Sequence, residues 1–261
     1  MKEIKMNKSA ERVVDVLFLL AKSEAPLTLN EICQKLSFPK SSGFELIQTL
    51  VVKGFVEVDD ARLKTYRLGL GAFEVGSAYL TNNDVTMQAR QPIQELNRLV
   101  GSTVFLGIED RGKIVYLDKA ESHSVMRPTA KLGSRRYMHT TGLGKALLAA
   151  FPDEKIKYIL ENGDIAKKTE FSKVTIPEIL NDVRGTRERG YSIDDREDNV
   201  EMFCMGSAIF DQWNEPVASI SVASSYNGMT VEKKKLITEL LQKTALDISK
   251  KLGYKGDRLY I

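Results

Sequence analysis

The sequence predicts an α+β protein with an N-terminal winged helix-turn-helix domain at residues 1–69, a linker helix at 70–83 and a larger domain at 84–261. Residues 28–53 hold two short amphipathic segments joined by a tight turn, and a hairpin pattern follows them. After Gly101 the apolar period changes from helical to alternating, which indicates strands. We therefore expect the larger domain to be a mixed or antiparallel sheet flanked by helices.

Composition limits the possible classes of protein. The 261 residues suffice for two ordinary domains, and 43% of them are hydrophobic, which is typical of globular chains. No apolar run approaches the roughly 20 residues of a membrane span, and the N-terminus lacks an apolar signal core. The two cysteines are far apart and have no histidine at metal-ligand spacing. We expect a cytoplasmic protein with no membrane partner, metal or cofactor; the net charge of +3 only weakly suggests a polyanionic partner.

The segment from Thr28 to residue 53 predicts a helix-turn-helix. Thr28 and Glu31 form a capping-box pattern, and Pro39 breaks the first helix. The second helix is expected over residues 40–53, with its polar residues on the face opposite its apolar stripe. A recognition helix presents such a face to the major groove. An ordinary helical hairpin with a solvated outer face is the alternative.

A wing is predicted directly after these helices. Residues 55–58 and 64–68 read as strands around a turn at 59–62. Arg62 and Lys64 lie at its tip, where they can reach phosphate or the minor groove. With an amphipathic helix at 9–23, the wing favours DNA binding over the plain hairpin.

The larger domain is expected to begin between residues 80 and 84. A helix follows to about residue 100, and Pro92 either kinks it or marks its start. Strands are predicted at 103–109, 113–120, 125–129, 191–195, 204–211 and 217–224. Further helices are predicted from about 142, at 153–161, at 175–189 and at 231–252.

The segment GLGK at 142–145 resembles a phosphate-binding loop but lacks its required residues, because His139 and Ala146 stand at two of them. A hydrolase that uses Cys204 and His139 has no further support, since a cysteine in an apolar strand is usually core. A pocket that binds a small molecule explains this segment more simply than a phosphate-binding loop or a hydrolase does. Helix N-terminal amides attract anions, and glycine permits close approach.

Three motifs, GSRRYMHTTGLGKALLA, RERGYSIDDREDNVEMFC and AIFDQWNEPVASISVAS, together with the winged helix, resemble the IclR family of bacterial transcriptional regulators. The resemblance covers residues 9–254. It implies a GAF-like effector-binding domain, a double-stranded DNA operator as partner, and self-association as a dimer or a dimer of dimers. Its small-molecule effector would be an organic acid or a sugar-derived metabolite.

The expected DNA contacts are Lys40, Ser41, Ser42, Phe44, Glu45, Gln48, Arg62 and Lys64. The expected effector contacts are Gly142, Leu143, Asp194, Cys204, Ser221, Val125, Arg136, Met138 and Met202. Arg135, one residue before Arg136, is a further candidate to supply positive charge for a ligand carboxylate.

The sequence departs from the family pattern at several positions. Ala223 stands where a second family serine would fall, and Arg136 stands where some relatives are apolar. These departures suggest a larger but still anionic ligand. Glu45 stands where arginine is frequent, and Gly43 costs a helix about 1 kcal/mol relative to alanine.

Two other functions remain open from the sequence. One is a metabolite-binding enzyme that depends on Cys204 and carries an accessory DNA-binding domain. The other is a regulator that senses no ligand and is controlled by its oligomeric state.

Overall fold

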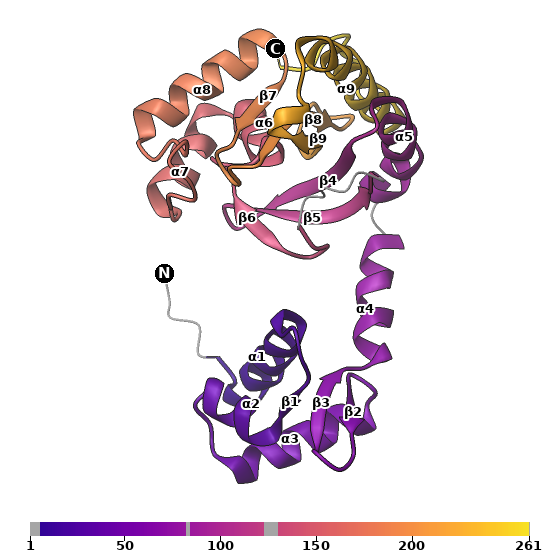
Figure 1. Cartoon of the computed structure of the whole chain (residues 1–261), viewed down its shortest axis with the longest axis vertical. Helices are drawn as coiled ribbons and strands as arrows, with labels where there is room; N and C mark the ends of the chain where they lie inside the picture. Colours follow the sequence, from indigo (N-terminus) through magenta and orange to yellow (C-terminus); the bar gives the residue numbers. More distant parts are fainter. Residues whose placement is uncertain (1–5, 82–83, 123–129, 261) are drawn as a thin grey trace. The chain divides into compact units, whose positions relative to one another are not determined.

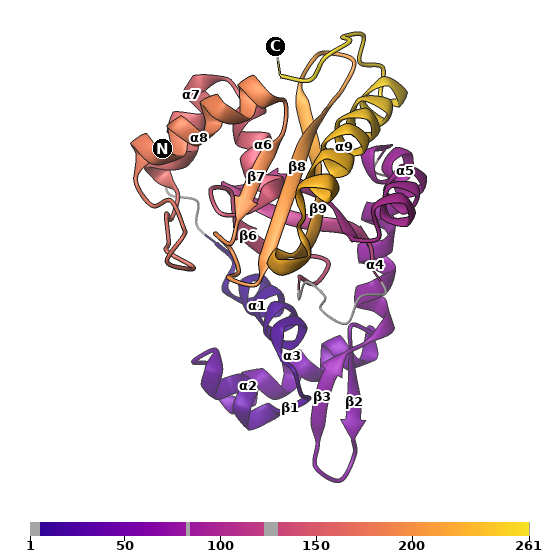
Figure 2. The same cartoon turned by 45° about the horizontal axis from the view of Figure 1, so that its top comes forward.

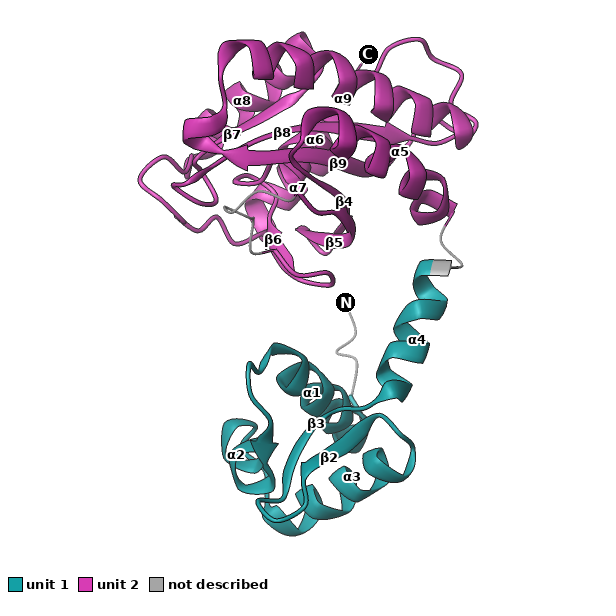
Figure 3. Cartoon of the chain, turned by 45° about the vertical axis from the view of Figure 1, so that its right-hand side comes forward, with its two compact units in different colours: residues 1–82 teal, residues 83–261 magenta. Residues whose placement is uncertain are grey.

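The computed structural model describes residues 6–81, 84–122 and 130–260, which form two compact units, Met1–Asn82 and Asn83–Ile261 (Figure 3). Within these residues, no helix is both long and apolar enough to cross a membrane. The expected strand at 125–129 and the expected contact Val125 lie outside the described residues.

The first unit is a winged helix, with three helices, a three-stranded antiparallel sheet of order β1-β3-β2, and a further helix at its end. Its elements are α1 (Lys8–Lys22), β1 (Leu27–Thr28), α2 (Leu29–Lys35), α3 (Lys40–Val52), β2 (Val56–Asp60), β3 (Thr65–Leu68) and α4 (Leu70–Thr81). The capping box is confirmed, because Glu31 N donates to Thr28 Oγ1 at 3.3 Å and Thr28 N donates to Glu31 Oε2 at 2.7 Å. Strand β1 was not predicted, since two residues carry no period.

Gly43 lies in the tight corner between α2 and α3. It is buried, and a Cβ at this position would lie 2.4 Å from Cys33 Sγ and 2.9 Å from Phe38 Cε2. Real Cβ atoms do not approach other heavy atoms that closely, so a larger residue would push the two helices apart. The glycine therefore fixes how closely the recognition helix α3 packs on α2, despite its low helix propensity.

We predict that Gly43→Ala lowers the free energy of unfolding of the winged helix by about 1–3 kcal/mol, because overpacking outweighs the gain in helix propensity. Gly76→Ala is the matched control, since Gly76 is also helical and has nothing within 4 Å of a built Cβ. This control should be neutral or stabilising. Denaturant unfolding measures both, and equal shifts for the two variants would contradict the packing argument.

The second unit is built on a six-stranded sheet of order β6-β5-β4-β9-β8-β7, in which every neighbouring pair is antiparallel. Helix α6 packs against β8 and β9, while α5 and α9 contact each other and the strands β4 and β8 (Figures 1 and 2). The strands are β4 (Thr103–Asp110), β5 (Lys113–Ala120), β6 (Arg135–Tyr137), β7 (Ser192–Asp195), β8 (Met202–Phe210) and β9 (Pro216–Ser225). The helices are α5 (Asp84–Val100), α6 (Gly142–Ala150), α7 (Asp153–Asn162), α8 (Ile176–Arg189), the 3-10 turn η1 (Tyr226–Gly228) and α9 (Val231–Lys251).

One expectation for this unit is corrected, and one strand was not predicted. Pro92 does not mark the start of its helix, because α5 begins at Asp84 and continues through the proline. Residues 135–137 form an edge strand that the sequence did not predict, because the segment is short and polar. The sheet is antiparallel throughout, which decides between the mixed and antiparallel alternatives.

Candidate functional site

The outer face of α3 presents most of the expected DNA contacts. The side chains of Lys40, Ser41, Phe44 and Glu45 are exposed, and Phe44 is 52% exposed despite being apolar. An exposed aromatic ring on a recognition helix suits contact with a thymine methyl group. Ser42 is half-buried, and its hydroxyl donates to the carbonyl of Pro39 at 3.0 Å, so it is partly committed to the helix start. Gln48 is also half-buried and lies farther along the helix.

The wing tip presents the other two expected contacts. Arg62 and Lys64 are both exposed in the turn between β2 and β3. Asp60 holds this turn, because its Oδ1 accepts hydrogen bonds from the backbone N–H groups of Arg62 at 2.7 Å and Leu63 at 2.9 Å. Arg62 and Lys64 therefore lie on a turn that these hydrogen bonds stabilise.

In the second unit, the first turn of α6 meets β8 and β9 at a small cavity. A Cβ on Gly142 would lie 3.2 Å from the Cβ of Cys204 and 3.5 Å from the Cβ of Ser221. Thr141 caps the helix by accepting from Gly144 N at 3.1 Å. The first amides of a helix have no partner within the helix, so those of Gly142 and Leu143 remain available for an anion.

The cavity has a volume of about 50 Å³. Its wall combines aromatic rings from β4 and β5 with polar groups from β6, the start of α6, β7, the residues that follow β7, and the strands β8 and β9. The lining residues are Phe105, Tyr116, Ala130, Arg136, Thr141, Gly142, Asp194, Asp198, Asn199, Met202, Cys204, Ser221 and Ala223.

The two neighbouring arginines differ in their roles. Arg136 lines the cavity, and its Nε is buried without a hydrogen-bond partner among the described residues. Arg135 lies outside the lining, and its guanidinium binds the carboxylate and carbonyl of Asp110. A buried, unpaired guanidinium nitrogen is costly, so a bound acceptor would stabilise it. Arg136, not Arg135, is therefore the cationic candidate.

Burial shifts the protonation of two groups on the cavity wall, Asp194 and Cys204. It raises the pKa of Asp194 to about 7, while Lys145 and the amide of Glu197 act to lower it. Burial also raises the pKa of the Cys204 thiol well above its ordinary value, and the adjacent Asp194 carboxyl raises it further. The thiol therefore stays neutral, which argues against a nucleophilic role.

Most, but not all, of the expected effector contacts meet at this cavity. The structure brings Gly142, Asp194, Cys204, Ser221, Arg136 and Met202 together on its wall. The side chains of Leu143 and Met138 instead lie in the hydrophobic core, so Leu143 can contribute only its amide. His139 is not on the lining, and its Nε2 lies 3.1 Å from the carbonyl of Ala166.

The sequence reasoning missed Phe105, Tyr116, Ala130, Thr141, Asp198 and Asn199 as lining residues. Phe105 is paired with Ser221 in the register of β4 and β9, but that pairing of distant strands has no local signal. Asp198 and Asn199 could have been suspected, because they follow Asp194 closely in a polar run.

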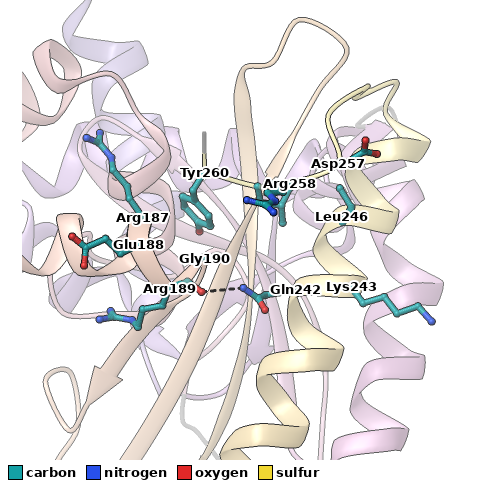
Figure 4. A pocket seen from close by; sticks show the side chains of 11 residues that line it. Arg187, Glu188, Arg189, Gly190, Gln242, Lys243, Leu246, Asp257, Arg258 and Tyr260 are labelled. Carbon is teal, nitrogen blue, oxygen red and sulfur yellow. Dashed lines mark hydrogen bonds between the residues drawn. The ribbon is translucent and has the colours of Figure 1, made fainter.

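A second hollow of about 400 Å³ lies between the end of α8, α9 and the C-terminal segment (Figure 4). It contains several cationic side chains, but Arg187 already donates to the carbonyls of Ala149 at 2.8 Å and Phe151 at 2.9 Å. On its other side, Gln242 Nε2 donates to the carbonyl of Arg189 at 3.2 Å. The smaller cavity is the better candidate for an anion, because Arg136 Nε on its wall is buried without a partner among the described residues, whereas Arg187 and Gln242 are already paired.

Comparison with known proteins decides the family. The profile described as "IclR helix-turn-helix domain" matches residues 9–60, and "Bacterial transcriptional regulator IclR C-terminal" matches residues 77–250. The chain belongs to the IclR family of transcriptional regulators. An IclR-family relative, the "HTH-type transcriptional repressor AllR" of Escherichia coli K12, is 35% identical over 94% of this chain and 90% of its own length. The AllR of Salmonella typhimurium is also 35% identical, over 94% of this chain and 90% of its own length.

Solved IclR structures share the fold. The Thermotoga maritima IclR matches with a TM-score of 0.80 at 27% identity, covering 95% of this chain and 99% of its own. An IclR homologue from Microbacterium hydrocarbonoxydans, complexed with 4-hydroxybenzoate, matches with a TM-score of 0.81 at 17% identity. The match covers 94% of this chain and 98% of the homologue.

We predict that alkylation of Cys204 by iodoacetamide has a pH midpoint above that of a free thiol, because the thiolate is the reactive form and its pKa is raised. Asp194→Asn removes the neighbouring carboxyl and should lower this midpoint, though not to the free value, since burial remains. Asp195→Asn is the control, because Asp195 pairs with Arg196 and is not on the cavity wall. Peptide mass spectrometry measures the rates, and equal midpoints for parent and Asp194→Asn would contradict the assignment.

Proposed function

We propose that this IclR-family protein represses transcription from an operator that its winged helix recognises, and that a small carboxylate in the cavity controls its DNA affinity. The unpaired Nε of Arg136, beside free helix amides, supports the carboxylate most directly. The names of the AllR relatives support repression.

The small volume narrows the class of effector. A cavity of about 50 Å³ suits a small acid better than the larger acid suggested by the sequence. A neutral Asp194 can donate a hydrogen bond to such an acid, and the neutral Cys204 thiol can do the same. These donors, with Arg136 and the helix amides, favour an anion, whereas the Asp198 side chain on the same wall supplies acceptor oxygens. We retain the self-association implied by the family, as a dimer or a dimer of dimers.

A coupling mechanism follows from the proposal. The effector must bind the DNA-bound and free arrangements with different affinities. Helix α4 connects the two units and is fixed to the winged helix, because Gly71 N donates to the carbonyl of Gly54 at 2.9 Å. We propose this helix as the coupler.

A gel-shift titration against fragments of the host genome at physiological salt tests the regulator, with acetate, glycolate, lactate, pyruvate or 4-hydroxybenzoate added in turn. Selective binding that one small acid changes is the expected result. Weak, unselective binding that salt abolishes would contradict recognition of an operator. Turnover of an acid by pure protein, lost in Cys204→Ser, would favour the enzyme alternative.

We predict that Lys40→Ala weakens DNA binding and lowers the magnitude of the salt slope by about one unit, because one phosphate contact is lost. Lys40 is exposed at the first turn of α3, where the helix N-terminus also favours phosphate. Lys155→Ala removes the same charge from the second unit and should leave the slope unchanged. An unaltered slope in Lys40→Ala would rule out a phosphate contact.

We predict that Arg136→Gln weakens binding of the tightest acid in that panel by about tenfold or more, since a charge-assisted hydrogen bond contributes about 1.5–3 kcal/mol. Isothermal titration calorimetry measures the affinity. Arg135→Gln is the matched control, because Arg135 is paired with Asp110 outside the cavity. Equal affinities for the parent and Arg136→Gln would contradict the role of this charge.

A further inference from the structure

A buried ion cluster lies next to the cavity, formed by Lys145 of α6, Glu197, Asp182 of α8 and Lys173. The side chain of Lys145 is 4% exposed and that of Glu197 is 2% exposed. Lys145 Nζ lies 2.5 Å from Glu197 Oε1 and 2.7 Å from Asp182 Oδ2, and it also donates to the carbonyl of Ile193. Lys173 Nζ approaches the same Glu197 oxygen at 2.6 Å. The guanidinium of Arg189 also lies 4.0 Å from Asp182 Oδ1, so three cations surround the two carboxylates.

The cluster is connected to the cavity wall through one short segment, residues 193–199. Glu197 N donates to Asp194 Oδ1 at 2.8 Å, and Asp198 N donates to the same oxygen at 3.4 Å. Asp194, Asp198 and Asn199 all line the cavity. Lys145 therefore holds this segment at two points, the carbonyl of Ile193 and the carboxylate of Glu197.

The other side of the segment is fixed as well. Ser172 Oγ donates to the carbonyl of Glu197 at 2.7 Å, and Thr169 Oγ1 donates to the carbonyl of Arg196 at 2.7 Å. The Arg196 guanidinium lies 3.9 Å from the ring centroid of Phe171 and 4.0 Å from that of Tyr226. The 193–199 segment is thus held between the buried cluster on one side and Thr169, Phe171, Ser172 and Tyr226 on the other.

Stability alone does not explain such a cluster, because well-packed apolar residues often replace a buried ion pair without loss of stability. We propose that Lys145 and Glu197 are positioning residues, which hold Asp194, Asp198 and Asn199 in the arrangement that accepts a carboxylate. The proposal rests on the proposed function, namely that a carboxylate occupies this cavity. Neither residue is on the cavity lining, so both act through the 193–199 segment.

Competing alkylation of Cys204 tests this proposal on the full-length protein. Iodoacetate carries a carboxylate, whereas iodoacetamide is its neutral counterpart of similar size, and both alkylate the thiolate with loss of iodide. The ratio of their rate constants at Cys204, divided by the same ratio for free N-acetylcysteine, gives a carboxylate preference. A merely looser cavity would accelerate both reagents and leave this preference unchanged. Peptide mass spectrometry separates Cys204 from Cys33.

We expect a preference above one in the parent protein, and a decrease of about tenfold in both Lys145→Met and Glu197→Gln, an effect typical of residues that orient binding groups. The two substitutions change charge in opposite directions. A simple charge effect would therefore lower the preference in the first and raise it in the second, and that outcome would overturn the positioning role. Unchanged preferences in both variants would overturn it as well.

The remaining controls separate the proposed carboxylate site from the proposed positioning role of Lys145 and Glu197. A parent protein without any carboxylate preference would contradict the carboxylate site itself and, with it, the positioning role. Lys155→Met is the matched control, since Lys155 pairs with Glu109 away from the cavity, and it should leave the preference unchanged. If Lys145→Met alone fails to fold, Lys145→Met combined with Glu197→Gln keeps Asp182 beside Lys173 and should show the same loss.

Discussion

The close approach of α6 to strands β8 and β9 is the contact on which the candidate site depends. A Cβ on Gly206 would lie 2.3 Å from the carbonyl oxygen of Gly142, so only glycine at position 206 lets the helix backbone rest directly on the sheet. This contact places the unpaired amides of the helix beside Cys204 and Ser221. Asp194, on the wall of the same cavity, is buried, and this burial raises the pKa of its carboxyl to about 7.

The same physical constraint recurs in the winged helix. Gly43 sits where α3 meets Cys33 and Phe38, and its missing side chain sets the distance between the two helices of the motif. The propensity cost of glycine in a helix is therefore compensated by packing. In the winged helix, Gly43 lets α3 pack closely on α2. In the second unit, Gly206 lets α6 rest directly on the sheet. Both glycines thus fix where a helix presents its polar groups.

The chemistry of the cavity supports the proposal that it binds a ligand. Its donors include an unpaired guanidinium nitrogen on Arg136, helix amides and a neutral thiol. A nucleophile would require a lowered thiol pKa, whereas burial and Asp194 raise that of Cys204. The environment thus explains why a cysteine, an aspartate and an arginine can share a small space in a regulator.

The sequence by itself determined the helix-turn-helix with its capping box, the wing and most strands of the second unit, because these depend on local periodicity and caps. The tertiary structure decided which of Arg135 and Arg136 faces the cavity, and it removed Met138 from the lining. It also revealed the buried cluster around Lys145, which the sequence analysis did not predict. The physical reason is that burial and charge pairing depend on strands and helices that are distant along the chain, such as β7, α6 and α8, and no local pattern specifies their contacts.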